Sequence, residues 1–304
     1  MALRPLDNAL PTTPERPKKV AKIAISTRKP SSDLGVNDEN KAPPAATGDL
    51  AVDYIASKDL KALPEPETKI QSLMEGLNSK DWTKVCESLN GTRRFALHHS
   101  SLLLPILDKV TQVMVKAMKN PRSALCKTSI MASSDVFNAF GGNILDSAAS
   151  DAFDPLLLQL LLKASQDKRF VCEEADRALQ AMVASMPPVP LLHKLRAYVS
   201  HANLRVRAKA AVVISNCVSN MGLGGMKEFG LVSLIQLAAD LLNDRLPEAR
   251  EAARSTVTSI HEAFIRDEAL NTNDGSSLVE RWQSFCSSNL PPIQAQSVMK
   301  IIPS

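Results

Sequence analysis

Aromatic residues and glycine are scarce in this sequence. Only 4% of the 304 residues are aromatic, and only 11 are glycines. Strands favour β-branched and aromatic residues, and tight hairpin turns depend on glycine, so the composition disfavours a large antiparallel sheet. Hydrophobic residues make up 44% of the chain, which is enough for a sizeable core. The composition therefore predicts an all-α protein.

Long apolar runs are also missing, and we expect no signal peptide. Arg4, Pro5 and Asp7 stand where an apolar leader segment would run, and stretches such as 156–162 are far shorter than the ~20 residues that span a bilayer. The five cysteines are odd in number and widely spaced, so we expect reduced thiols in an intracellular protein. A net charge of +4 is small, so any electrostatic partner must meet a local patch.

Residues 1–66 differ from the rest of the chain. They hold nine of the 19 prolines and no aromatic residue before Tyr54, so we expect a disordered, Pro-rich basic tail. One stretch of this tail carries basic residues without an acidic one. These residues are Arg16, Lys18, Lys19, Lys22, Arg28 and Lys29. The stretch is either a solvated charge run, a weak nuclear localisation signal, or an arm that binds an acidic polymer or surface.

From residue 67 onward the pattern becomes helical. Apolar residues recur at spacings of three and four, for example over 103–118 and 231–242, and short segments rich in Pro, Gly or Asn separate these stretches. A motif also recurs in which Asp or Asn precedes an apolar residue and then a Cys or Arg. The aligned Cys or Arg positions are Cys86, Cys126, Cys172, Arg207 and Arg250. Their mean spacing of 41 residues matches HEAT and armadillo units, and so predicts an α-solenoid of five to six HEAT-like hairpins over 67–304, with the sixth at 278–300.

The residue types in the motif have a physical explanation. Asp or Asn before a helix accepts hydrogen bonds from unpaired N–H groups, so each motif is expected to begin the second helix of a hairpin. Arg207 and Arg250 are expected to reach the acidic cap of the preceding repeat. Cys86, Cys126 and Cys172 are expected to be small buried side chains rather than metal ligands, because no C-x-x-C or H-x-x-x-H accompanies them.

Catalytic motifs are absent from the sequence. The five histidines are scattered, and no G-x-S-x-G occurs. The glycine-rich stretch 222–225 lacks the Gly-Lys-Ser/Thr ending of a phosphate-binding loop, and we interpret it as a loop between repeats. We therefore expect no enzyme, no cofactor and no metal, and a function that resides in a surface.

The loops within the hairpins are expected to emerge along one edge, which we call the loop edge. Each loop offers at least one cation, and the first also offers an indole. The candidate residues are Lys80, Trp82, Lys119, Arg122, Lys168, Arg169, Arg205 and Arg245. A single exposed cation is usually only solvated, but this recurrence predicts a basic ridge for an acidic protein surface, with Trp82 as its apolar anchor.

These features resemble the TOG domain of the CLASP and crescerin families of microtubule-associated proteins. The resemblance rests on the HEAT-like units, on Lys80-Asp81-Trp82 and on the basic residues of the later loops, and covers about 67–264. In that family the first-loop tryptophan and the later basic loops bind the tubulin heterodimer.

The resemblance implies a non-catalytic microtubule-associated protein of the cytoplasm and cytoskeleton. The eight loop-edge residues would bind tubulin, the basic tail would bind the microtubule lattice, and neither a membrane nor a nucleic acid is an expected partner. The alternative hypothesis is a HEAT or armadillo adaptor that binds a non-tubulin protein through its concave helical surface.

Overall fold

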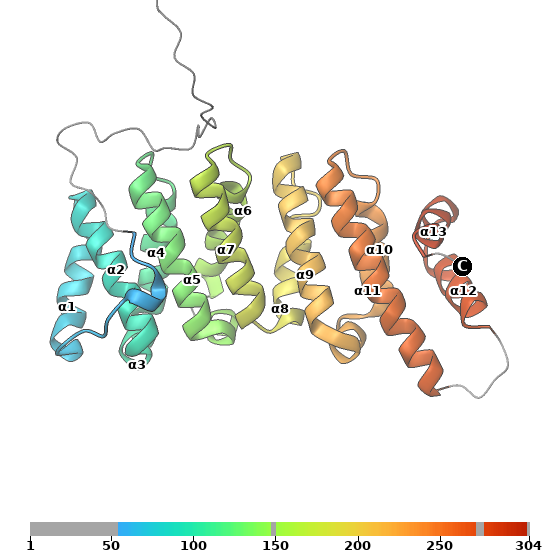
Figure 1. The fold of residues 1–304 in the computed structure, drawn as a ribbon, viewed down its shortest axis with the longest axis horizontal. Helices are drawn as coiled ribbons and strands as arrows, with labels where there is room; N and C mark the ends of the chain where they lie inside the picture. Colours follow the sequence, from blue (N-terminus) through green and yellow to red (C-terminus); the bar gives the residue numbers. More distant parts are fainter. Residues whose placement is uncertain (1–53, 147–149, 272–276, 303–304) are drawn as a thin grey trace, which may run out of the picture. The chain divides into compact units, whose positions relative to one another are not determined.

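The computed structural model describes residues 54–146, 150–271 and 277–302. Regular secondary structure within these ranges is helical, and successive helices form antiparallel pairs (Figure 1). The predicted all-α array of HEAT-like hairpins is confirmed. Residues 1–53, which include the predicted basic stretch, lie outside the described residues.

The helix pairs follow the predicted order along the chain. The first helices of the pairs are α1 (Pro66–Leu77), α4 (Leu107–Met118), α6 (Ser150–Ala164), α8 (Pro188–Arg196) and α10 (Leu231–Leu241). Their partners are α2 (Trp82–His98), α5 (Ser123–Asp146), α7 (Arg169–Ser185), α9 (Leu204–Phe229) and α11 (Pro247–Asn271). Two short elements, α3 (Ser100–Leu103) and η2 (Leu104–Ile106), join α2 to α4. The last pair, α12 (Leu278–Asn289) and α13 (Pro292–Met299), forms at the predicted sixth repeat.

The second helices of the pairs pack beside one another and form what we call the second-helix face. α2 packs on α5, α5 on α7, and α9 on α11, whereas the contact between α7 and α9 is slight. A single apolar cluster runs through the described array from Leu73 to Val298, as stacked hairpins require. None of the helices in the described part of the chain has the length and apolar character needed to cross a membrane.

Lys209 of α9 spans the junction where α7 and α9 contact only slightly. Its Nζ lies 3.4 Å from Asp176 Oδ1 of α7 and 3.1 Å from Glu248 Oε1 of α11. Burial raises the pKa of Asp176 despite the nearby ammonium. A charged bridge therefore joins three second helices across this junction.

The three aligned cysteines occupy equivalent positions near the starts of α2, α5 and α7. Cys86 and Cys126 are buried, and Cys172 is half-buried with its thiol donating to the Ala164 carbonyl at 3.0 Å. Burial raises the pKa of all three thiols, and it raises the pKa of Cys217 to about 12. These side chains therefore pack as small apolar groups rather than as thiolates.

Two glycines, Gly141 and Gly222, lie inside helices. α5 continues past Gly141 (φ 30°) and α9 past Gly222 (φ 63°), each at a kink. A Cβ at Gly141 would stand 2.2 Å from the Ser185 carbonyl oxygen, so only glycine lets α5 approach the end of α7. The prediction of an inter-repeat loop at 222–225 is wrong, because 223–229 remain helical after the kink.

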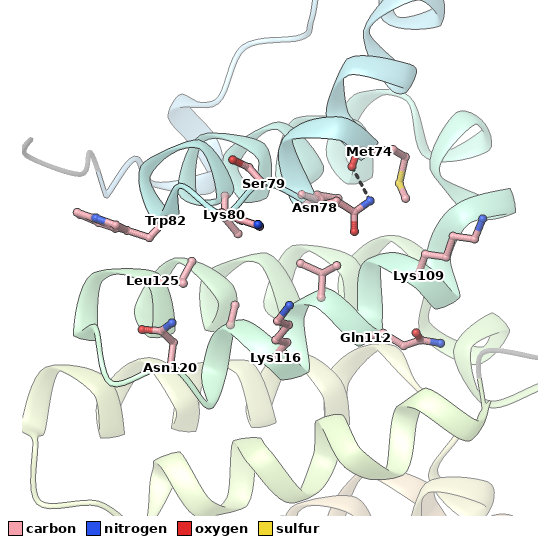
Figure 2. A pocket seen from close by; sticks show the side chains of 14 residues that line it. Met74, Asn78, Ser79, Lys80, Trp82, Lys109, Gln112, Lys116, Asn120 and Leu125 are labelled. Atoms are coloured by element: carbon pink, nitrogen blue, oxygen red, sulfur yellow. Dashed lines mark hydrogen bonds between the residues drawn. The ribbon is translucent and has the colours of Figure 1, made fainter.

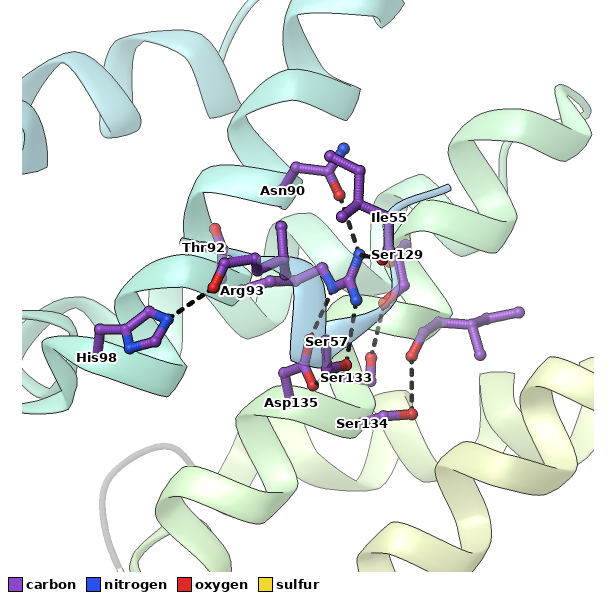
Figure 3. A network of polar contacts seen from close by, with 12 residues as sticks. Ile55, Ser57, Asn90, Thr92, Arg93, His98, Ser129, Ser133, Ser134 and Asp135 are labelled. Carbon is purple, nitrogen blue, oxygen red and sulfur yellow. Dashed lines mark hydrogen bonds and ion pairs between the residues drawn. The ribbon is translucent and has the colours of Figure 1, made fainter. Parts of the chain in front are cut away.

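Residues 54–60, which the sequence assigns to the tail, pack against α2 and α5, and we call them the N-terminal strap (Figure 3). The strap contains the 3₁₀ turn η1 (Ser57–Asp59), and its last residue, Leu60, is only 3% exposed. The Leu60 carbonyl lies 2.8 Å from His98 Nε2 of α2. Apolar burial and backbone hydrogen bonding therefore both fix the strap.

A buried ion pair lies beneath the strap. Arg93 Nε of α2 donates to Asp135 Oδ2 of α5 at 2.7 Å, and the two side chains are only 1% and 2% exposed. Arg93 also donates to the Ile55 carbonyl at 2.8 Å and to Ser57 Oγ at 3.2 Å, and the Ser57 hydroxyl donates to Asp135 Oδ1 at 2.7 Å (Figure 3). The strap therefore supplies hydrogen bonds that this buried pair needs.

Candidate protein-binding edge

The loops that join the two helices of each of the first five pairs lie at the same end of the helices (Figure 1). These loops are 78–81, 119–122, 165–168, 197–203 and 242–246. The helix order produces this arrangement, because in these five pairs the first helix runs toward that end and the second helix runs away from it (Figure 1). The loop edge is therefore a continuous feature of the described array.

Side chains join the first three loops to one another. The Arg122 guanidinium stands 5.2 Å from the centre of the Trp82 ring, a cation–π distance. Lys168 Nζ lies 3.4 Å from Ser123 Oγ, where α5 begins. The first three loops are thus close enough for one partner to contact them together.

The later loops are joined by two arginines of α9. Arg205 Nη1 donates to Asp167 Oδ1 of the third loop at 2.6 Å. Arg207 Nε donates to Asp244 Oδ2 of the fifth loop at 2.8 Å. The prediction that Arg207 and Arg250 reach back to a preceding repeat is wrong. Arg207 points forward, and Arg250 donates to the carbonyls of Asp244 and Arg245 in its own loop.

The Asp and Asn residues of the motif shape the loops. Asp81 caps α2 and accepts from Thr83 N at 2.9 Å and from Thr83 Oγ1 at 2.7 Å. These hydrogen bonds hold the pKa of Asp81 below its ordinary value. Three other motif residues accept from the N–H two residues on, namely Asn120, Asn203 and Asp244. Asp167 is the exception, because the N-cap position of α7 is occupied by Lys168. Asp167 pairs with Arg205 instead.

All the predicted loop-edge cations are exposed. Two of them already have partners within the chain, because Arg169 pairs with Glu173 at 2.7 Å and Arg205 pairs with Asp167. The others make no ion pair with any residue in the described ranges. They are Lys80, Lys119, Arg122, Lys168 and Arg245. The loop edge therefore carries positive charge that no described acidic group neutralises.

Two aromatic side chains accompany these cations. Trp82 is half-buried, with part of its indole packed on the core and part left accessible. Phe170, in the first turn of α7, is 46% exposed and was not among the predicted contact residues. The helical spacing of the sequence could have indicated this exposure. Val171, Ala175 and Ala178 form the buried face of α7, and Phe170 lies about 100° away from Val171 around the helix axis.

A groove opens beside the loop edge, between α1, the start of α2, and α4 (Figure 2). It has a volume of about 750 Å³. Trp82 and Asn120 stand at one end, Lys80 and Lys116 face each other across the middle, and Lys109 lies at the other end (Figure 2). We call this feature the α1–α4 groove.

The family model for the CLASP N-terminal domain matches residues 83–273. This chain belongs to the CLASP N-terminal family. Members of this family carry the TOG domain, which is not a catalytic domain, so the expectation of a non-enzymatic protein agrees with the family.

Curated relatives of this family member include the TOG array regulators of axonemal microtubules protein 1 of mouse and human. The mouse protein is 28% identical over 203 residues, which are 65% of this chain and 11% of the mouse protein. The human protein is 30% identical over 130 residues, which are 43% of this chain and 7% of the human protein. The chain thus matches about a tenth of the length of these relatives.

Solved TOG structures share the fold of this family member. A TOG domain from C. elegans Zyg9 superposes with a TM-score of 0.55 at 15% identity, covering 79% of this chain and 87% of that one. A structure reported for crescerin, which uses a TOG domain array to regulate microtubules in the primary cilium, superposes with a TM-score of 0.52 at 13% identity, covering 76% and 88%. At these identities the likeness concerns the fold.

Proposed function

We propose that this TOG domain binds tubulin through its loop edge, and that the basic stretch at 16–29 adds affinity for the acidic microtubule lattice. The proposed anchor is Trp82, and the proposed charged contacts are the loop-edge cations. Phe170 adds a second apolar contact. In this proposal the binding array comprises 67–304 together with the strap, and the names of the relatives suggest axonemal microtubules as its setting.

One observation carries the proposal. A half-buried indole and a row of exposed cations without described acidic partners share one edge, and Arg122 lies over the Trp82 ring. Anchors in protein interfaces are commonly Trp, Tyr and Arg side chains surrounded by weaker contacts. Because exposed like charges gain from an oppositely charged partner, the loop edge fits an acidic protein surface better than an apolar one.

Co-sedimentation with microtubules tests the proposal. The variant Trp82→Ala/Lys168→Ala/Arg169→Ala removes the anchor and two cations from the first and third loops. We expect Trp82 alone to contribute about 2 kcal/mol, roughly thirty-fold in affinity, and the cations to contribute a salt-dependent remainder.

The matched control is Tyr54→Ala/Arg254→Ala/Arg266→Ala. It also removes one aromatic side chain and two exposed cations, but from the strap and α11 rather than from the loop edge. The control should pellet like the wild type. Equal pelleting of the wild type and the loop-edge variant would show that this edge is not the binding face.

The basic stretch is tested separately, by replacing its six cations with Gln. Two weak sites on one chain reinforce each other through effective concentration, so this variant should keep its affinity for free tubulin while losing affinity for microtubules. The loss should shrink as salt is added, because salt weakens the attraction that the tail supplies.

The competing hypothesis of an adaptor places the partner on a helical surface of the array, such as the second-helix face. The strap covers α2 and α5 on that face, and Tyr54 lies beneath Lys127 Nζ at 4.5 Å from the ring centre. A pull-down that compares the loop-edge variant with Arg177→Ala on α7 separates the hypotheses. An adaptor would lose its partner through the second change and not through the first.

A further inference from the structure

The α1–α4 groove has a charge pattern that the loop edge does not explain. Lys80, Lys109 and Lys116 line it, and no Asp or Glu is among its lining residues. None of the three lysines makes an ion pair with a residue in the described ranges. Asp108, at the start of α4, is not a lining residue and accepts a hydrogen bond from Gln112 at 2.8 Å. Three ammonium groups therefore share one groove without a counter-charge from its walls.

The geometry of α4 arranges its two lysines in a line along the groove. Lys109, Gln112 and Lys116 follow one another on α4 at spacings of three and four, and Asn120 follows in the loop after it, so the four side chains form one polar stripe that lines the groove (Figure 2). Lys109 and Lys116 are seven residues apart, which is about 10 Å along a helix. Apolar side chains line the groove at both ends, with Met74 near Lys109 and Trp82 at the opposite end (Figure 2).

An extended acidic chain fits this layout. In a polyproline II conformation, side chains three residues apart point the same way and are about 9 Å apart, close to the separation of Lys109 and Lys116. Because ammonium groups gather without a described counter-charge, a ligand with carboxylates relieves their repulsion. Apolar side chains, among them Leu77 and Val85, also line the groove, so it offers a place for one apolar side chain beside the Trp82 ring.

We propose that the α1–α4 groove is a binding site for an extended, glutamate-rich segment of a partner protein, with its carboxylates on Lys80, Lys116 and Lys109 and an apolar side chain against Trp82. The site shares Lys80 and Trp82 with the loop edge and extends from it along the body of α4, where Lys109 and Lys116 lie. It provides a second means of recognising an acidic partner, one that reads a flexible chain rather than a folded surface.

The test uses the full chain and a fluorescent twelve-residue peptide that carries glutamates at every third position and one phenylalanine. Fluorescence anisotropy should show binding that weakens with added salt. A peptide with glutamine in place of every glutamate should bind at least tenfold more weakly. Equal binding of the two peptides would overturn the proposal, because the groove would then read apolar groups alone.

Charge reversal locates the site. Lys109→Glu/Lys116→Glu should weaken binding of the glutamate peptide at least tenfold, whereas Lys61→Glu/Lys300→Glu, which makes the same change in net charge at exposed lysines outside the groove, should leave it within about twofold. Equal loss in both variants would show that net charge, not the groove, attracts the peptide, and would overturn the proposal. No tubulin is present, so this result is independent of the co-sedimentation result.

Discussion

Arginine–aspartate pairs join neighbouring helix pairs both on the second-helix face and on the loop edge. Arg93–Asp135 measures 2.7 Å with side chains 1% and 2% exposed, and Arg205–Asp167 measures 2.6 Å with side chains 59% and 88% exposed. The distances are nearly equal, but water surrounds only the second pair. Exposure, rather than distance, therefore decides how much each pair stabilises the fold.

The difference in exposure assigns different roles to the two regions of the molecule, stability to the second-helix face and partner binding to the loop edge. Removing one member of a buried pair leaves a charge without solvent or partner, so the Arg93 side fixes the structure. An exposed pair gains little and exchanges readily with water, so the loop edge can give up its internal contacts to a partner without unfolding the array. Arg207–Asp244 lies between the two extremes, at 2.8 Å with side chains 19% and 5% exposed.

The largest effect is expected for Arg93→Leu. The substitution leaves Asp135 buried without its partner, and breaking such a pair costs about 3–5 kcal/mol. The strap also loses the donor to the Ile55 carbonyl and to Ser57. Urea unfolding should show the loss of stability, and limited proteolysis should show earlier cleavage within 54–60.

Asp135→Asn serves as the control for this change. It keeps the shape of the side chain and removes the buried carboxylate, so its effect reports the charge pair rather than the volume of Arg93. If both variants unfolded at the wild-type urea concentration, the buried pair would not stabilise the array.

A smaller effect is expected for Arg207→Leu. The change removes a charge-assisted hydrogen bond to Asp244, and bonds of this kind contribute about 1.5–3 kcal/mol. Arg207 also donates to the His201 carbonyl at 2.9 Å, so the fourth loop loses a contact as well. Urea unfolding should show a loss in the free energy of unfolding that lies between the losses of the Arg93 and Arg205 variants. A value as small as that of the Arg205 variant would contradict the ranking by exposure.

The sequence predicted the helical array and the loops because their causes are local. The apolar spacing of α4 and the caps Asp81 and Asn203 act over a few residues, so they can be recognised without coordinates. The direction of Arg207 could not be recognised in this way. Asp167 and Asp244 both lie within reach of α9, and only the relative placement of the repeats decides which arginine meets which acid.

The strap and Phe170 show a second limit of sequence reasoning. The strap is held through the backbone carbonyls of Ile55 and Leu60. Every residue type has such a carbonyl, so the sequence does not indicate which residues make these hydrogen bonds. The composition of 1–66 is that of a tail, yet Leu60 finds a buried site on the array. The loop-edge and tail contacts with tubulin stay predictions, since they depend on a partner.

Lowering the pH should reveal how much the Asp244 carboxylate contributes to the stability of the folded chain. Burial alone would raise the pKa of Asp244, but the N–H of Leu246 and the Arg207 guanidinium together hold that pKa below its ordinary value. The unfolded chain therefore binds this proton at a higher pH than the folded chain does. The stabilisation is present above the ordinary pKa of Asp and is lost as pH falls through the folded value.

Urea unfolding between pH 7 and pH 3 measures this contribution. The wild type should lose stability more steeply than Asp244→Asn over the acid part of the range, because the variant has no carboxyl group to titrate at this position. Parallel curves would show that Asp244 does not couple folding to protons.

The smallest effect is expected for Arg205→Ala. Its partner Asp167 is 88% exposed, so water replaces the guanidinium once it is removed, and exposed pairs contribute about 0.2–1 kcal/mol. Salt should reduce even this difference, because exposed charges are screened. The same variant should nevertheless weaken microtubule binding in co-sedimentation, since Arg205 is a proposed contact. A loss of binding with nearly unchanged urea unfolding would separate the two sides of the molecule, and a large loss of stability would show that the loop edge is part of the structural framework.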